Sequence, residues 1–146
     1  MTELVFVDTN VLVYARDAAA GEKQSRAAAW MVHLWRGRTG RVSFQVLQEY
    51  YVTLTRKLKP GLPQEAARNE VRRLLTWRPQ VVDDSVLLGG WTIQDRFGLS
   101  FWDALIVSAA REAGCRYLLT EDLQHDQDLD GLRIMSPFVA TPASVS

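Results

Sequence analysis

Little in this sequence can hold a fold together covalently, because the 146 residues contain a single cysteine, Cys115. One cysteine cannot form an intramolecular disulfide, and this one lies in an apolar stretch where a small buried thiol is the usual finding. A disulfide-stapled secreted scaffold is therefore excluded, and we expect Cys115 to pack in the core.

Long apolar runs are also missing. No stretch approaches the length of a membrane span, and the first residues lack the basic segment and apolar core of a signal peptide. We therefore expect no membrane association and a cytoplasmic location.

No excess of one charge is present either, since seventeen basic residues balance seventeen acidic ones. The net charge gives no indication of the partner, although a local basic face remains compatible with it. The apolar fraction of 47% and the charged fraction of 23% are those of a folded globular chain. We expect one domain over residues 1–140 and a flexible tail over 141–146.

Short apolar runs alternate with longer stretches of helical period, which is the pattern of a parallel α/β fold. We expect strands at residues 4–7, 42–44, 80–82, 117–119 and 132–135. The helices are expected at residues 23–35, 45–57, 64–77, 84–97 and 101–113, the last capped by Ser100 and nearly apolar all round.

Four acidic residues share one topological position, at strand exits or helix starts: Asp8, Glu49, Asp103 and Asp122. In a parallel sheet the strand exits share one edge, and ligands bind in the crevice outside it. Singly, each acid has an ordinary structural explanation, such as a helix-dipole contact or an Asx-turn. Their coincidence at one edge favours a common site.

Crowded carboxylates in a partly desolvated pocket repel one another unless some are protonated or a cation enters. Oxygen ligands without histidine or cysteine suit Mg²⁺ or Mn²⁺. Such an ion can activate a water against a phosphodiester and stabilise the leaving oxygen.

The segments "VFVDTNVLVY", "QVLQEYY", "SFWDALIVSAA" and "YLLTEDL" resemble, in order and spacing, the acidic motifs of PIN-domain nucleases. The likeness is closest to the VapC-type toxins of bacterial toxin–antitoxin pairs and spans residues 4–138. It implies a three-layer α/β/α sandwich with a parallel, about five-stranded sheet. It also implies a Mg²⁺-dependent endoribonuclease in which Mn²⁺ substitutes, a homodimer, and an antitoxin that covers the active site.

Carried over by position, the resemblance assigns catalytic and metal-binding roles to Asp8, Glu49, Asp103 and the more variable Asp122. Asn10 matches the residue that steadies the first aspartate, and Thr120 opens the last motif. Glu121 and Asp126 are neighbouring alternatives for the fourth acid. We expect Asp122 because its register after "YLLT" fits best.

Basic and aromatic residues are the candidates for contact with RNA. One arginine run, Arg36, Arg38 and Arg41, is a possible phosphate-binding cluster, whereas Arg68, Arg72 and Arg73 are better explained as a solvated helix face. Aromatic rings can stack on unpaired bases. For most of them, however, we expect packing in the core or a dimer: Trp30, Trp35, Tyr50, Tyr51 and Trp102.

Other functions remain open from sequence alone. An aspartyl-phosphate phosphatase usually has a second aspartate at the position of Asn10. A receiver domain has a lysine after its last strand, whereas no lysine follows Lys59 in this sequence. A Rossmann domain has a glycine-rich turn after the first strand, and this sequence lacks one there. A catalytically silent PIN-fold binding module and a housekeeping PIN ribonuclease without an antitoxin are the remaining alternatives.

Overall fold

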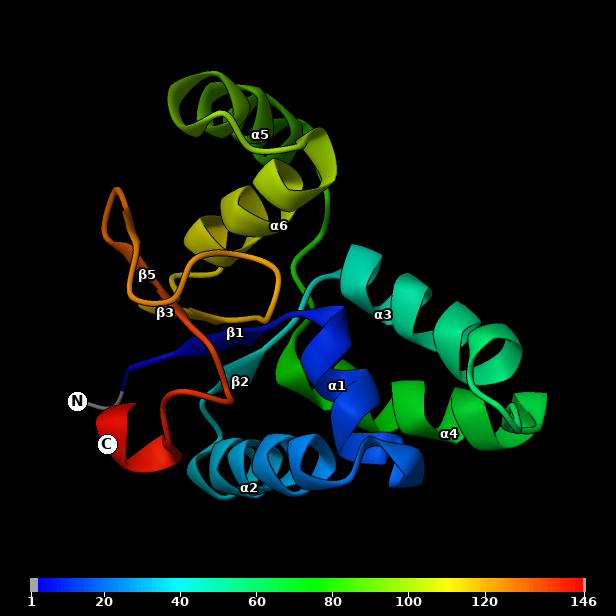
Figure 1. Cartoon of the computed structure of the whole chain (residues 1–146). Coiled ribbons are helices and arrows are strands. Elements are labelled where there is room, and N and C mark those ends of the chain that lie inside the picture. Colours follow the sequence, from blue (N-terminus) through cyan, green and yellow to red (C-terminus); the bar gives the residue numbers. More distant parts are fainter. Residues whose placement is uncertain (1–2, 146) are drawn as a thin grey trace.

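One five-stranded sheet forms the centre of the structure, a computed structural model that describes residues 3–145 (Figure 1). Residues 1–2 and 146, at the outer ends of the expected domain and tail, lie outside the described residues. The strand order is β2-β1-β3-β5-β4, and every pairing is parallel except that of β4 with β5. The strands are β1 (Val5–Val7), β2 (Gly40–Arg41), β3 (Tyr117–Leu119), β4 (Asp128–Leu129) and β5 (Leu132–Met135).

Helices cover both faces of this sheet, which gives the expected α/β/α sandwich. In Figure 1, α5 and α6 lie above the sheet, α1 and α2 lie below it, and α3 and α4 form a pair at its side. The α-helices are α1 (Thr9–Arg16), α2 (Glu22–Gly37), α3 (Phe44–Val52), α4 (Gln64–Leu74), α5 (Asp84–Phe97) and α6 (Phe101–Glu112). Shorter helical turns are η1 (Ala18–Ala20), η2 (Thr53–Lys57), η3 (Leu75–Trp77) and η4 (Pro142–Val145).

The core lies between the sheet and its two helical layers. Strand β1 is buried at every residue, as expected for a parallel strand covered on both faces. Trp30, Tyr50 and Cys115 are buried, which confirms their expected packing, and Trp77 is buried as well. Trp102 is different, because 64% of its surface is exposed, so it does not pack in the core of this chain.

Two of the five expected strands are wrong in position or type. The second strand is Gly40–Arg41 rather than 42–44, because Ser43 caps α3 by accepting a hydrogen bond from the Val46 amide. Residues 80–82 form only a single bridge, between Gln80 and Ser43. The fifth strand is instead β4, which makes an antiparallel hairpin with β5, so the sheet is not wholly parallel.

Helix α1 was not expected from the sequence. The apolar run "VFVDTNVLVY" continues through it, but Asp8 stops the strand by accepting a hydrogen bond from the Thr9 amide at 2.7 Å. The aspartate is therefore the N-cap of a helix as well as a candidate ligand.

Helix α6 carries Asp103 in its first turn, and it packs against α5. They approach closely, since a Cβ on Gly89 would meet the Ser108 Oγ at 2.5 Å. The same hydroxyl donates to the Val86 carbonyl at 2.8 Å. Packing on the sheet and on α5 thus anchors the helix that carries the third acid.

The end of the chain carries some local structure. The turn η4 lies within the segment expected to be a tail, and Val145 is buried. The flexibility of this tail and the extent of the domain stay predictions. Among the helices of residues 3–145, none has the length and apolar character needed to cross a lipid bilayer.

Candidate active site

A pocket of about 430 Å³ opens at the carboxyl ends of the strands, and all four predicted acids line it: Asp8, Glu49, Asp103 and Asp122. We call it the acid pocket. Asp8 follows β1, Asp122 lies just beyond β3, Glu49 is on α3 and Asp103 is in the first turn of α6. Four segments that are distant in sequence therefore bring carboxylates to one edge of the sheet, as expected.

Asp8 is the most buried of the four, with 8% of its surface exposed. Its Oδ1 accepts from the Thr9 amide at 2.7 Å, and its Oδ2 accepts from the Thr120 hydroxyl at 2.8 Å. Burial raises the pKa of Asp8 to about 6, against the opposing effect of these hydrogen bonds. The nearby charges of Asp122 and Glu49 add to the rise in pKa.

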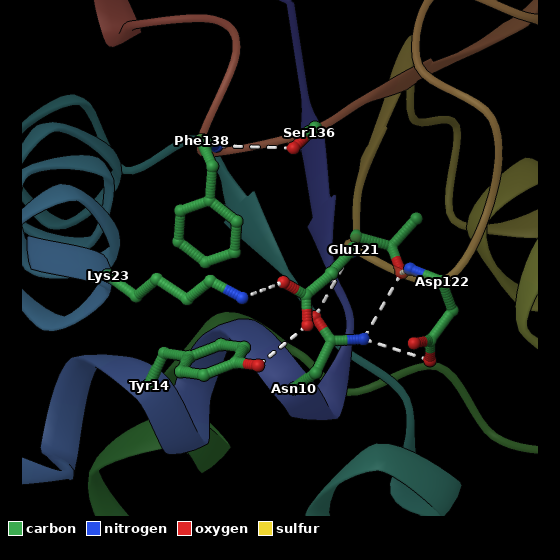
Figure 2. A network of polar contacts seen from close by, with 8 residues as sticks. Asn10, Tyr14, Lys23, Glu121, Asp122, Ser136 and Phe138 are labelled. Atoms are coloured by element: carbon green, nitrogen blue, oxygen red, sulfur yellow. Dashed lines mark hydrogen bonds and ion pairs between the residues drawn. The ribbon is translucent and has the colours of Figure 1, made fainter. Parts of the chain in front are cut away.

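Asn10 connects the two strand exits, as Figure 2 shows. Its Nδ2 donates to Asp122 Oδ2 at 3.0 Å and lies 3.3 Å from the Thr120 hydroxyl. Its Oδ1 accepts from the Glu121 amide at 3.3 Å. A longer contact of 3.4 Å joins Nδ2 to Asp8. One amide side chain on α1 thus holds the loop after β3 and orients its aspartate.

Glu121 is turned away from the acid pocket. In Figure 2 its carboxylate and that of Asp122 point to opposite sides of Asn10. Tyr14 and Lys23 each donate to the Glu121 carboxylate at 2.6 Å. Partial burial alone would raise the pKa of Glu121, but these hydrogen bonds outweigh it and lower the pKa.

Asp126 also lies outside the lining of the acid pocket. It accepts from Arg133 at 3.0 Å, in an ion pair beside the β4–β5 hairpin. Asp122 is therefore the one of the three candidate fourth acids that faces the other carboxylates, although its role as a ligand stays a prediction.

Glu49 is held by hydrogen bonds on both carboxylate oxygens. The Thr9 hydroxyl donates to Oε2 at 2.9 Å, and Gln45 Nε2 donates to Oε1 at 3.0 Å. Gln45 is 7% exposed and lines the pocket, yet its Oε1 has no hydrogen-bond partner among residues 3–145. A buried, unpaired acceptor at a pocket wall marks a place for a donor from solvent or ligand.

Asp103 lies where the start of α6 meets the pocket. Its backbone amide donates to the N-cap Ser100 hydroxyl at 3.3 Å. Desolvation raises the pKa of the Asp103 carboxyl, and the charges of Asp122 and Glu49 add to this. The neighbouring charges thus disfavour the ionised forms of Asp8 and Asp103, as expected of a pocket that attracts a cation.

Gln45 and Trp102 are among the lining residues of this pocket that sequence reasoning did not assign to the site. Gln45 lies four residues before Glu49, so both are on one face of α3, a spacing that could have indicated it. Trp102 lies beside Asp103 at the pocket and contacts Phe101 edge to face, with ring centroids 5.1 Å apart. Only the exposure of Trp102 separates it from the packed aromatics, and exposure is not visible in the sequence.

The predicted arginine cluster is not part of the acid pocket. Arg36 is exposed in the last turn of α2, and Arg38 and Arg41 line a separate cavity. Contact of these residues with RNA stays a prediction.

The donor set of the acid pocket fits a hard divalent cation, since every candidate ligand is an oxygen. Within residues 3–145, no three acidic, histidine or cysteine side chains form a group that could hold a metal ion as they stand. Mg²⁺ commonly binds through one or two carboxylates and keeps several waters. The unpaired Gln45 oxygen is a suitable acceptor for such a water, so the residues present fit a hydrated ion.

Fold and site together define a three-layer α/β/α protein with an all-carboxylate pocket at the sheet's carboxyl edge. The chain belongs to the PIN domain family, whose profile matches residues 5–127. The resemblance predicted from its four acidic motifs is therefore confirmed. No curated protein matches the chain in sequence.

Several solved structures share this fold. The FitAB complex bound to an IR36 DNA fragment has a TM-score of 0.72 at 17% identity, covering 94% of this chain and 97% of that one. A toxin–antitoxin complex from Klebsiella pneumoniae has a TM-score of 0.62 at 17% identity, covering 91% and 97%. Mycobacterium tuberculosis VapC20, described as a sarcin–ricin loop cleaving toxin, has a TM-score of 0.57 at 21% identity, covering 78% and 86%.

Proposed function

We propose that this protein is a divalent-metal-dependent endoribonuclease and the toxin of a toxin–antitoxin pair. The observation that carries the proposal is the convergence of four carboxylates from four separate segments on one pocket, beside an unpaired buried acceptor. Membership of the PIN domain family and the toxin–antitoxin complexes among the structural neighbours support it.

Asp8 and Asp103 would hold the cation, with Glu49 and Asp122 completing the site. Mg²⁺ suits these ligands, and Mn²⁺ is expected to substitute. When bound, the cation orients and activates a water against a phosphodiester and stabilises the leaving oxygen.

The surrounding side chains keep the carboxylates in place. Thr120 donates to Asp8, Thr9 donates to Glu49, and Asn10 donates to Asp122. These contacts fix three of the four acids before substrate arrives, which reduces reorganisation during the reaction. The free Gln45 oxygen accepts a hydrogen bond from a water or a ribose hydroxyl that enters the pocket.

RNA is the expected substrate class, with the base of an unpaired nucleotide lying against Trp102. The exposed ring stands beside Asp103, so a phosphate held at the acids brings a neighbouring base within its reach. Unpaired bases stack on such rings, whereas bases in a duplex are covered by their neighbours.

The expected partners are a cognate antitoxin that covers the acid pocket and a second copy of the chain. We expect the homodimer to use the apolar face near residues 45–54, where Val52 is exposed. Cellular RNA as substrate implies action in the cytoplasm.

Cleavage of total cellular RNA by purified, antitoxin-free protein with Mn²⁺ tests the proposal. Asp8→Ala and an EDTA sample serve as controls. Discrete fragments that disappear in both controls would support a metal-dependent endoribonuclease. Intact RNA in the presence of folded, metal-loaded protein would instead favour a catalytically silent binding module.

Growth on expression in a bacterial host separates a toxin from a housekeeping ribonuclease. We expect arrest with the wild-type chain and normal growth with Asp8→Ala. Normal growth with a wild-type chain that cleaves RNA in vitro would contradict the toxin assignment.

A further inference from the structure

A second cavity, of about 420 Å³, combines arginine and tryptophan side chains. We call it the arginine cavity, and it is lined by Trp35, Arg38, Arg41, Thr76, Trp77 and Arg78. It has no residue in common with the acid pocket.

The arginine cavity extends from β2 toward the residues that precede this strand, away from the strand ends that the acids follow. Strand β2 runs from the end of α2 to the start of α3 (Figure 1), and it is parallel to β1. Arg38 precedes β2, whereas Glu49 follows it and Asp8 follows β1. In the sheet register Arg41 lies opposite Phe6, two residues before Asp8, and Arg38 lies three residues further back along the chain.

The cavity carries three positive charges and no carboxylate in its lining. Among residues 3–145 no ion pair involves Arg38, Arg41 or Arg78. Arg41 is oriented by neighbouring backbone carbonyls, since its Nη1 donates to the Gly40 carbonyl at 2.8 Å and lies 3.3 Å from the Arg38 carbonyl. By contrast, Arg72 on α4 is paired with Glu65 at 2.8 Å. The cavity is thus a concentration of uncompensated positive charge on a chain of zero net charge.

The backbone at two of these arginines is left-handed. Arg38 ends α2 with φ 57°, and Arg78 ends η3 with φ 54°. Glycine is the usual residue at such helix ends because it has no Cβ to clash. Arginine is less favourable than glycine in this backbone conformation. What arginine provides at both positions, and glycine does not, is a charged side chain.

Aromatic side chains form the walls of the arginine cavity. The rings of Trp35 and Trp77 lie 4.7 Å apart between centroids. Trp77 is buried, and its indole nitrogen has no hydrogen-bond partner within the described residues. Gly40 makes room for this ring, since a Cβ there would approach it to 2.4 Å.

We propose that the arginine cavity binds the phosphate backbone of single-stranded RNA outside the acid pocket, with a base against its tryptophan wall. This inference rests on the proposed function. Without a bound cation the acid pocket repels phosphates, so a basic surface elsewhere has to supply binding energy for RNA. Guanidinium groups bind phosphate and stack on bases, and tryptophan adds stacking, a combination that fits nucleic acid better than an acidic peptide.

The test is the salt dependence of RNA binding by the full chain. Fluorescence anisotropy with a labelled RNA of about 20 nucleotides, longer than typical single-strand sites, gives the dissociation constant, and EDTA prevents cleavage. The cavity variant is Arg38→Gln, Arg41→Gln and Arg78→Gln together. The control variant removes the same charge from ion-paired arginines: Arg68→Gln, Arg72→Gln and Arg96→Gln.

The slope of log affinity against log salt is expected to fall by about 2 in the cavity variant, at about 0.7 per phosphate contact. The control variant should keep the wild-type slope. With Mn²⁺, the cavity variant should raise KM for RNA and leave kcat unchanged. Because Arg41 contacts the backbone, the double variant of the exposed Arg38 and Arg78 repeats the measurement without disturbing that contact.

Equal slopes in the wild type and the cavity variants would overturn the inference, as would an equal fall in the control. If polyglutamate of the same total charge as the RNA binds with the same affinity and displaces it, the cavity would instead be assigned to an acidic protein segment. If the wild type binds RNA through these arginines but never cleaves it, the cavity stands and the proposed nuclease fails. If the wild type neither binds nor cleaves RNA, both fail.

Discussion

The charge on Asp8 should make the metal-free protein less stable than a variant that lacks this charge. The folded pKa of Asp8 is raised to about 6 by burial, against 3.8 for an ordinary aspartate. The folded state therefore holds a proton between these pH values that the unfolded state has released. The free energy of unfolding consequently falls as the pH rises from about 4 to about 6.

The size of this effect follows from the difference between the two pKa values. A difference of about two pH units corresponds to roughly 3 kcal/mol at 1.36 kcal/mol per unit. In Asp8→Asn the side-chain nitrogen can donate to the Thr120 hydroxyl, and the oxygen still accepts from the Thr9 amide. Because these hydrogen bonds are imperfect, we expect the free energy of unfolding of metal-free Asp8→Asn to exceed that of the wild type by about 2 kcal/mol above pH 7.

Urea unfolding in EDTA at pH 7.5 and at pH 4 measures this difference. Asp8→Asn should be more stable than the wild type at the higher pH and equal to it at the lower pH. Asp95→Asn, an exposed change on α5, should alter stability by less than about 0.5 kcal/mol. Mn²⁺ should stabilise the wild type at pH 7.5 and have little effect on Asp8→Asn. If Asp8→Asn is destabilised equally at both pH values, the reasoning from burial is refuted.

Three further predictions concern the two sites. Asp122→Ala should weaken Mn²⁺ binding less than Asp8→Ala, because Asp122 is exposed and Asp8 is buried; calorimetry showing equal or reversed losses would contradict this ranking. Trp102→Ala should weaken binding of single-stranded RNA by about 1–3 kcal/mol, whereas Trp91→Ala, an exposed tryptophan on α5, should not; equal effects in anisotropy, or a change of oligomeric state in Trp102→Ala, would oppose a stacking role. Arg38→Gly should stabilise the chain by about 0.5–1 kcal/mol by relieving its left-handed backbone while weakening RNA binding; lower stability in urea unfolding would remove the argument from strain.

The sequence predicted the edge of the sheet at which the acids meet, because that inference needs only the order of elements. Each acid follows a strand or opens a helix, and parallel strands bring such positions together. Exact strand limits were not needed, which is why the error at the second strand did not disturb the position of Glu49.

The errors come from residues that have two roles. Asp8 lies within an apolar run, and as the N-cap of helix α1 it accepts a hydrogen bond from the Thr9 amide where the strand ends. Val81 and Val82 favour a strand by composition, yet both are exposed and only Gln80 pairs with the sheet. Tertiary contacts decided these elements, and local preference does not contain them.

The orientation of side chains was also beyond the sequence. Glu121 and Asp122 are neighbours of similar chemistry, and Lys23 and Tyr14 decide which of them leaves the pocket. Arg78 joins Arg38 and Arg41 only because the segment after η3 returns to pair beside β2. Nothing in the local sequence indicates that contact.

The proposed function requires that water, rather than the ribose 2′-hydroxyl, attacks phosphorus at the acid pocket. The most direct measurement uses an RNA with a mapped cut, resynthesised with a 2′-deoxy sugar at the cleaved nucleotide. With Mn²⁺ we expect cleavage at the same place, linear terminal phosphates in the products, and no cleavage by Asp8→Asn. Resistance of the 2′-deoxy substrate together with 2′,3′-cyclic phosphate ends on the ordinary RNA would contradict this requirement.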